Sequence, residues 1–370
     1  APVIVDTIAG IATSAGPHQN VNFSGMEELC LDDETRDEVN IDIGELYVRT
    51  TDFRERIIYT LWNDGGLKLR IDDLENGIYN TFPEHFGLVN GVQMLERIVA
   101  FARDGNDLVS IADHVVDGND DPIPVEFHGE DGNDYLAGGT GDDILVGGPG
   151  NDRVLGGEGD NLLFGDGNVL DADGIPIEDP QTDGNDRLSG RSGNDVIFGG
   201  GGNDRLVGSD GDDYLHAGSG DDLAGGGLGD DVLVGADGDD TLSGDDGDDI
   251  VLGGAGEDEV LGRQGHDVLL GGDDADRVRG EEGDDLVVGG NASNVNDATT
   301  EAALRAVLAE WVASGPTVPG GLGTLQLDGV QDLLIGDQGA DAFHFSMLPE
   351  LEDEDRVFDF LPGDGDTLLP

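Results

Sequence analysis

Apolar residues recur every nine positions through residues 181–290. In residues 226–234, for example, Leu233 stands two residues after Asp231. An apolar residue between two outward-facing neighbours predicts a short strand. The glycines before it predict a tight turn, since glycine readily adopts positive φ angles. A fixed short period predicts that this turn-and-strand unit is stacked many times. The apolar position is filled in all twelve copies, by Leu188, Ile197, Leu206, Leu215, Ala224, Leu233, Leu242, Val251, Val260, Leu269, Val278 and Val287.

Each copy also carries an aspartate and two glycines at fixed places. The glycine two residues before the aspartate is present in eleven of twelve copies, with Asp274 as the exception. The glycine five residues before it is present in ten, and Gln181 and Ala217 replace it in the others. Four further copies run through residues 129–164, where Asn161 takes the fourth aspartate position.

This nonapeptide resembles the hemolysin-type calcium-binding repeat of RTX (repeats-in-toxin) proteins from residue 129 onward. The resemblance implies a right-handed parallel β-roll, with two nonapeptides per coil and Ca²⁺ between neighbouring turns. It also implies that the repeated aspartates supply carboxylate ligands: Asp134, Asp143, Asp152, Asp186, Asp195, Asp204, Asp213, Asp222, Asp231, Asp240, Asp249, Asp258, Asp267, Asp276 and Asp285. The turns supply backbone carbonyls around Gly132, Gly141, Gly150, Gly184, Gly193, Gly202, Gly211, Gly220, Gly229, Gly238, Gly247, Gly256, Gly265 and Gly283. Asn161 and Asp274 depart from the pattern, so their sites are the weakest of the set.

Electrostatics independently requires a cation in such a roll. Every second aspartate lies above its predecessor at the strand spacing of about 4.8 Å, and each pair repels by about 0.9 kcal/mol in water. Oxygen ligands without histidine or cysteine favour Ca²⁺ over Zn²⁺ or Cu²⁺. The alternative is an acidic, glycine-rich disordered segment, which does not explain an apolar residue kept in phase.

The composition is strongly acidic, with 82 acidic residues against 17 basic ones and a formal net charge of −65. This balance excludes nucleic-acid binding by charge, and no apolar run is long enough to span a membrane. Weak extracellular calcium modules bind with constants on the order of 0.1–1 mM. We therefore expect an extracellular or cell-surface protein whose folding is coupled to export.

Six blocks are predicted along the chain. Residues 1–128 form a β-rich N-terminal domain, either a degenerate solenoid or a separate sandwich, in which residues 103–107 look like a half-formed repeat turn. Residues 129–164 are the first repeat block, and 165–180 are a loop insertion. The remaining three blocks are the main roll at 181–290, an insertion at 291–328 and a C-terminal capping region at 329–370, with closing strands near 341–345 and 355–360.

The insertion at 291–328 contains a predicted amphipathic helix at 297–313. One face of this helix carries the apolar residues Leu304, Val307, Leu308, Trp311 and Val312. The helix either covers its own domain, which we favour, or docks on a partner.

The residues that flank the buried apolar position divide the roll into two unlike faces. One sheet presents mostly apolar residues: Val196, Phe198, Tyr214, His216, Val232, Val234, Ile250, Leu252, Val268, Leu270, Leu286 and Val288. The other presents mostly polar ones: Arg187, Ser189, Arg205, Val207, Leu223, Gly225, Thr241, Ser243, Glu259, Leu261, Arg277 and Arg279. The helix, the N-terminal domain or another copy of the chain should cover the apolar face, because soluble monomers rarely expose so large a patch.

The chain carries no His-Glu-x-x-His, Gly-x-Ser-x-Gly or phosphate-binding motif, so we expect no enzyme. Two functions remain. The first is a calcium-stiffened structural or adhesive protein that self-associates into a surface layer, matrix or filament, through the apolar face or the end domains. The second is the non-catalytic carrier portion of a type I-secreted enzyme or toxin. The N-terminal residues 1–5 form a strand within their own fold or add one to a neighbour.

Overall fold

The computed structural model describes residues 97–111, 122–167, 184–292 and 301–314, together with short strands within residues 1–96 and 325–368. The chain divides into two compact units, Ala1–Gly167 and Asn168–Pro370, and each is described by itself.

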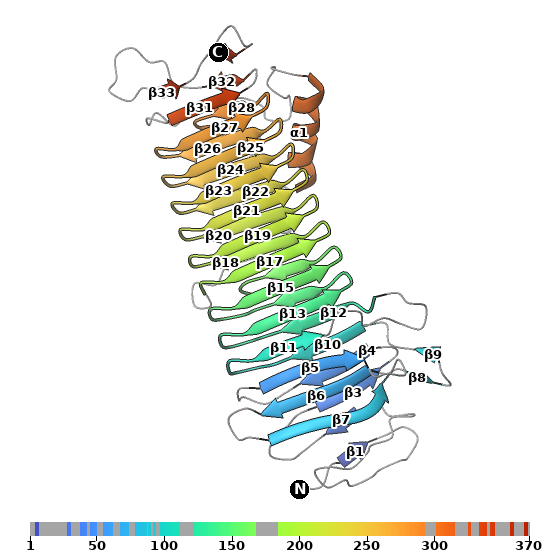
Figure 1. The fold of residues 1–370 in the computed structure, drawn as a ribbon. Coiled ribbons are helices and arrows are strands. Elements are labelled where there is room, and N and C mark those ends of the chain that lie inside the picture. Colours follow the sequence, from blue (N-terminus) through green and yellow to red (C-terminus); the bar gives the residue numbers. More distant parts are fainter. Residues whose placement is uncertain are drawn as a thin grey trace. The chain divides into compact units, whose positions relative to one another are not determined.

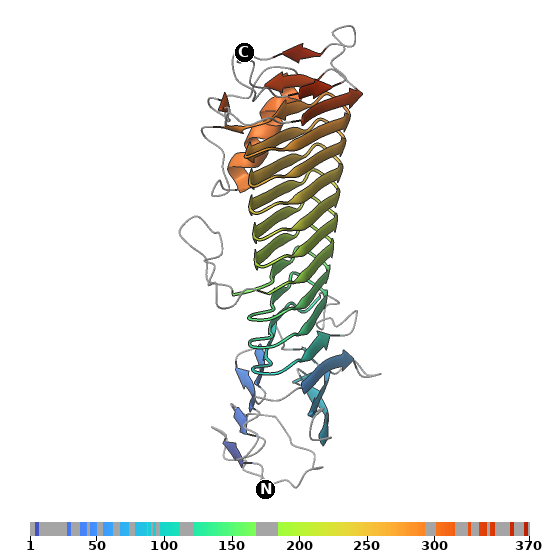
Figure 2. The same ribbon diagram turned by 90° about the vertical axis from the view of Figure 1, so that its left-hand side faces the viewer.

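The second unit is a stack of coils in which each coil contributes one strand to each of two sheets (Figures 1 and 2). Sheet A contains β18 (Val196–Gly201), β20 (Tyr214–Ser219), β22 (Val232–Asp237), β24 (Ile250–Ala255), β26 (Val268–Asp273), β28 (Leu286–Val288), β32 (Ala342–His344) and β34 (Thr367–Leu368). Sheet B contains β17 (Arg187–Ser192), β19 (Arg205–Asp210), β21 (Leu223–Leu228), β23 (Thr241–Asp246), β25 (Glu259–Gln264), β27 (Arg277–Glu282), β31 (Leu333–Gln338) and β33 (Arg356–Phe358). Neighbouring strands pair in parallel, for example β22 with β24 and β23 with β25, which confirms the predicted parallel β-roll.

The register between coils is eighteen residues, because Val232 pairs with Ile250 and Ile250 with Val268. This register brings the same repeat position of every coil into one column. The central apolar residues then form the column between the two sheets, and all of them are buried, including Leu233 and Val251 with no exposed surface. The predicted core position is confirmed.

The roll continues beyond the insertion. After β28, residues Asn291–Ala292 (β29) pair antiparallel with Leu325–Gln326 (β30), and α1 (Glu301–Ser314) lies between these strands in sequence. Strand β31 then pairs in parallel with β27, and β32 with β28. The segment predicted as a C-terminal cap therefore adds coils to the roll in the same register.

Helix α1 packs on sheet A, where it contacts β22 and β24 (Figure 1). Leu304, Val307 and Leu308 are buried, as expected for the apolar face. The prediction for Val312 is wrong, because its side chain is 45 % exposed. At about 100° per residue, Val312 lies some 80° around the helix from Leu304, at the edge of the apolar stripe. Predicted residues 297–300 lie outside the described part of the chain.

Most side chains on the outer face of sheet A are buried in the folded chain. Val232, Ile250 and Val268 are at most 1 % exposed, and Phe198 and Tyr214 are 4 % exposed. Because α1 packs on two of these strands, the predicted covering of the apolar face by the helix is confirmed there.

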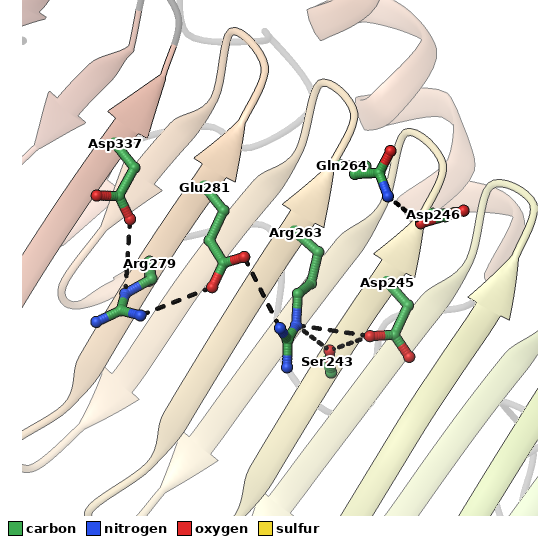
Figure 3. A network of polar contacts seen from close by, with 8 residues as sticks. All are labelled: Ser243, Asp245, Asp246, Arg263, Gln264, Arg279, Glu281 and Asp337. Carbon is green, nitrogen blue, oxygen red and sulfur yellow. Dashed lines mark hydrogen bonds and ion pairs between the residues drawn. The ribbon is translucent and has the colours of Figure 1, made fainter.

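The outer face of sheet B carries charged side chains that pair across successive strands (Figure 3). Arg263 lies 3.6 Å from Asp245 and 3.8 Å from Glu281, and Arg279 lies 3.7 Å from both Glu281 and Asp337. Such exposed pairs contribute little individually. The division into an apolar and a polar sheet is confirmed.

The first unit also contains parallel coils. One sheet runs through β10 (Arg97–Phe101), β12 (Val125–His128), β14 (Ile144–Val146) and β16 (Leu162–Phe164), and the other through β11 (Leu108–Ile111), β13 (Tyr135–Thr140) and β15 (Arg153–Glu158). Antiparallel strands extend both sheets: β1 (Ile4–Asp6), β2 (Glu28–Cys30), β3 (Glu38–Asp42) and β4 (Glu45–Arg49) on one side, and β5 (Glu55–Leu61), β6 (Leu67–Asp73) and β7 (Ile78–Phe86) on the other. A small hairpin joins β8 (Leu88–Val89) to β9 (Val92–Gln93). Residues 97–111 and 122–128 thus form part of the coils, and the strands before them are mainly antiparallel.

Candidate metal centre

The repeated aspartates form hydrogen-bonded ladders along both edges of the roll. The backbone N–H of Asp213 donates to Oδ1 of Asp231 at 2.7 Å, and the N–H of Asp231 donates to Oδ1 of Asp249 at 2.8 Å. On the other edge, the N–H of Asp222 donates to Oδ1 of Asp240 at 2.8 Å. All fifteen predicted aspartates are at most 4 % exposed. Oδ1 of each aspartate in these ladders therefore accepts a hydrogen bond from the backbone of the neighbouring coil.

The second carboxylate oxygen faces a different environment. Among the described residues, Oδ2 is buried without a hydrogen-bond partner in a large group of these aspartates: Asp134, Asp143, Asp213, Asp222, Asp231, Asp240, Asp249, Asp258, Asp267 and Asp285. Leaving a charged oxygen buried and unpaired is unfavourable. Repetition of this arrangement from coil to coil indicates a missing positive partner.

A glycine lines the space in front of nine of these ten oxygens, and Ala217 takes the corresponding place before Asp222. A Cβ atom on Gly226 would lie 2.1 Å from Oδ2 of Asp231 and 2.7 Å from the carbonyl oxygen of Gly244 in the next coil. The backbone of Gly226 does not have a positive φ angle, so glycine is needed there for space. By contrast, Gly229 has φ 123°, which favours glycine for conformational reasons. The space beside such a glycine is called a cradle below. At Gly226 it is lined by a carboxylate and a carbonyl oxygen from successive coils, and Gly235 and Gly253 have the same pair of oxygens.

This donor set fits a hard divalent cation. Calcium binds carboxylate and backbone carbonyl oxygens at about 2.3–2.6 Å, close to the spacing around the missing Cβ. Within the described part of the chain, no three His, Cys, Asp or Glu side chains converge on one point. Backbone carbonyls, such as that of Gly244, are further oxygen ligands within reach of the cradle.

Burial disfavours the ionised form of the metal-free carboxylates and so raises their pKa. Desolvation raises the pKa of Asp231 from 3.8 to about 9, against the opposing hydrogen bond from Asp213. The same cause raises the pKa of Asp249 to about 8 and that of Asp134 to about 7. At neutral pH, a bound cation would remove this penalty by supplying the missing charge.

The comparison with known protein families agrees with this geometry. The model of the RTX calcium-binding nonapeptide repeat, which holds four copies, matches residues 128–167, 181–215, 198–233, 225–260 and 261–295. These residues are RTX calcium-binding repeats. No curated protein matches the chain. The RTX cradles are thus the candidate Ca²⁺ sites, with the aspartates as carboxylate ligands.

The RTX ladder extends beyond the predicted aspartates. Asp107 donates its N–H to Oδ1 of Asp134 at 2.7 Å, although the family match begins at residue 128. At the other end, Asp285 donates to Oδ1 of Asp341 at 3.1 Å, and Asp341 to Asp366 at 3.3 Å. The sequence indicated a half-formed turn at residues 103–107 but not that Asp107 joins the ladder. Nine additional residues between Asp107 and Asp134 break the eighteen-residue spacing.

A second RTX ladder was not predicted at all. In many repeats the residue before the aspartate accepts a hydrogen bond through its side chain, as Asp212 does from the N–H of Asp230 at 3.0 Å, and Asp230 from Asp248 at 3.0 Å. Ala275, before Asp276, has no acceptor for such a bond. In this ladder the N–H of the later residue donates to the side chain of the earlier one, whereas in the first ladder the N–H of the earlier aspartate donates to the later one. The repeated Asn or Asp at this position was the available signal. His266 takes this position in one repeat; it is exposed, and its Nδ1 accepts from the N–H of Asp284 at 3.0 Å.

The two departures from the RTX pattern have different consequences. The Asn161 amide nitrogen donates to the carbonyl oxygen of Gly159 at 3.0 Å, so a donor stands where other repeats have the second carboxylate oxygen. Asp274 adopts the turn conformation with φ 74°. The cradle that follows it is retained, since a Cβ on Gly271 would lie 2.4 Å from Oδ2 of Asp276.

Arg305 of α1 reaches one edge of the RTX roll. Its guanidinium donates to the carbonyl oxygens of Asp212 at 2.8 Å, Asp213 at 3.0 Å and Asp230. The same positive charge lowers the pKa of Asp213 and Asp231, although burial outweighs it. The helix thus supplies a fixed cation at these turns.

We expect Arg305→Ala to loosen α1, because charge-assisted hydrogen bonds contribute about 1.5–3 kcal/mol. Hydrogen exchange of the α1 amides in saturating Ca²⁺ should become faster. Val312→Ala, an exposed change on the same helix, serves as the control. Equal exchange rates in the Arg305→Ala and Val312→Ala proteins would show that apolar packing alone holds the helix.

Proposed function

We propose that the chain is a non-catalytic, calcium-folded structural protein that acts outside the cell or at its surface. The observation that supports this function is the repeated cradle of buried, unpartnered carboxylate oxygens facing carbonyls of the next coil. A stack of such cradles is unstable as an anion array and becomes stable when cations fill it. Calcium would supply charge neutralisation and coil-to-coil cross-links.

The expected affinity range supports action outside the cell. Weak extracellular calcium modules are half-filled on the order of 0.1–1 mM, so they stay empty in a cytosol and fill after export. Because metal binding is coupled to folding, the chain would remain unfolded until it is secreted. The net charge of −65 keeps such an unfolded chain soluble. In the described residues, no helix is long and apolar enough to cross a bilayer.

The proposal includes self-association into a surface layer, matrix or filament. Sheet A is an unsuitable contact surface because most of its outer side chains are buried in the folded chain. The N-terminal strand is also engaged, since Ile4–Asp6 pairs with Glu28–Cys30 of the same chain. Sheet B remains available, and its outer face has an open depression of 620 Å³ bordered by Leu228, which is 52 % exposed. We therefore propose that copies contact one another through sheet B or the ends of the chain.

The alternative function is the carrier portion of a type I-secreted enzyme or toxin. Calcium-dependent folding after export serves this function equally well. The two functions differ in what the folded chain does next, since a carrier portion has no need to assemble.

The experiment measures folding and mass together. Far-UV circular dichroism and size-exclusion chromatography with light scattering are run in millimolar Ca²⁺, in millimolar Mg²⁺ and in chelator. We expect β structure only in Ca²⁺, because Mg²⁺ demands a smaller octahedral site and gives up water reluctantly. A fold that persists in chelator at neutral pH would contradict calcium-dependent folding. Polymers in Ca²⁺ support self-association, and a strict monomer favours the carrier function.

A further inference from the structure

The first position of the repeat lies next to the cradle in the neighbouring coils. This position lies five residues before the aspartate. In the turns that lead into sheet B it is held by Gly199, Ala217, Gly235, Gly253 and Gly271 among the described residues. One member of the series therefore carries a methyl group where the others carry none.

The neighbouring cradles show what that methyl group displaces. A Cβ on Gly235 would lie 2.3 Å from Oδ2 of Asp240 and 2.4 Å from the carbonyl oxygen of Gly253. A Cβ on Gly253 would lie 2.5 Å from Oδ2 of Asp258 and 2.2 Å from the next carbonyl. These spacings match calcium–oxygen distances of about 2.3–2.6 Å. The Cβ position of this residue thus coincides with the place where a cation contacts both oxygens.

Ala217 carries a methyl group at this position of its repeat. Ala217 has no exposed surface, and Oδ2 of Asp222, five residues later, is buried without a hydrogen-bond partner among the described residues. We propose that the Ala217 methyl group closes the Asp222 cradle to Ca²⁺. This inference rests on the proposed function, since it concerns which of the repeats bind calcium.

The closed cradle divides one row of ions into two. On its N-terminal side, the cradle of Gly199 stays open, with Oδ2 of Asp204 2.6 Å and the carbonyl oxygen of Ala217 2.3 Å from the missing Cβ. On its C-terminal side, the cradles of Asp240, Asp258 and Asp276 follow without a break. Ala217 therefore contributes a carbonyl oxygen to one site while its methyl group closes the next.

The first unit repeats this arrangement independently. Ala102 stands five residues before Asp107 and has no exposed surface, and Asp107 is 3 % exposed. The turn around Asp107 lies outside the matched family repeats, yet its rung of the ladder is formed. By the same reasoning, the Asp107 cradle is closed.

The test is the number of Ca²⁺ ions bound per chain. We expect Ala217→Gly to bind one ion more than the wild type, measured by native mass spectrometry and by equilibrium dialysis with metal analysis. Ala236→Gly is the matched control. It also removes a methyl group, but from the second position of the repeat that begins at Gly235, where φ is 84°. Its count should equal that of the wild type.

The reverse substitution tests the same geometry. Gly235→Ala should lose one ion, and the double variant Ala217→Gly/Gly235→Ala should return to the wild-type number. Should Gly235→Ala fail to fold, Ala217→Gly still decides the matter, since glycine is the residue found in the neighbouring coils. An unchanged or lower count in Ala217→Gly overturns this inference alone. A wild type that binds no Ca²⁺ overturns the proposed function instead.

Discussion

In calcium chelator, the chain is expected to be more folded at about pH 5 than at about pH 7.5. Burial raises the pKa of Asp222 to about 8, of Asp213 to about 7 and of Asp267 to about 9, from 3.8 in each case. A carboxyl group with a raised folded pKa stabilises the fold fully below its unfolded pKa. That stability is lost as pH rises through the folded pKa. The metal-free roll should therefore lose stability over about pH 4–9.

The size of this effect is large because many carboxyls act together. One pKa unit corresponds to about 1.4 kcal/mol, so a few such groups outweigh the roughly 5–15 kcal/mol net stability of a typical domain. Calcium should reverse the trend, since it binds the deprotonated carboxylates and competes with protons for the same oxygens.

Denaturant unfolding followed by circular dichroism, at several pH values with chelator and with saturating Ca²⁺, measures both trends. The sample is kept above the isoelectric point of 4.1 so that it stays soluble. Stability that rises with pH in chelator would contradict the inferred burial of uncompensated carboxylates.

Asp231→Asn is expected to weaken calcium binding and strengthen the metal-free fold. The substitution removes a ligand charge from an open cradle, so the Ca²⁺ concentration at the folding midpoint should rise. It also removes a carboxyl whose pKa burial raises to about 9. At neutral pH, the metal-free protein should gain on the order of a few kcal/mol of stability.

Asp230→Asn is the matched control, one residue away and with the same loss of charge. Oδ1 of Asp230 accepts from the N–H of Asp248, and asparagine serves that function elsewhere, as Asn194 does for Asp212. Calcium titrations of both variants by circular dichroism separate ligation from general charge. Equal midpoint shifts in the two variants would show that Asp231 acts only through long-range charge.

Much of this molecule follows from the period of nine. The aspartate and apolar positions predicted parallel coils, the buried column around Leu233 and the difference between the two sheets. These predictions succeed because every repeat places its apolar residue and its aspartate at the same positions. Stacked coils bury all of the apolar residues in one column. The prediction for Val312 was wrong because helical periodicity alone does not say where a packed face ends.

The sequence by itself determined the strands, the turns and the need for cations, since these depend on spacing that repeats along the chain. Only the tertiary structure decided which oxygens face each cradle, because the two ladders join atoms that are eighteen residues apart in sequence. It also decided that α1 covers sheet A and that Arg305 reaches the turns of distant coils. Finally, the proposal for Ala217 depends on the tertiary structure. In the sequence this alanine is a minor substitution, whereas in the roll its methyl group stands where neighbouring coils leave room for an ion.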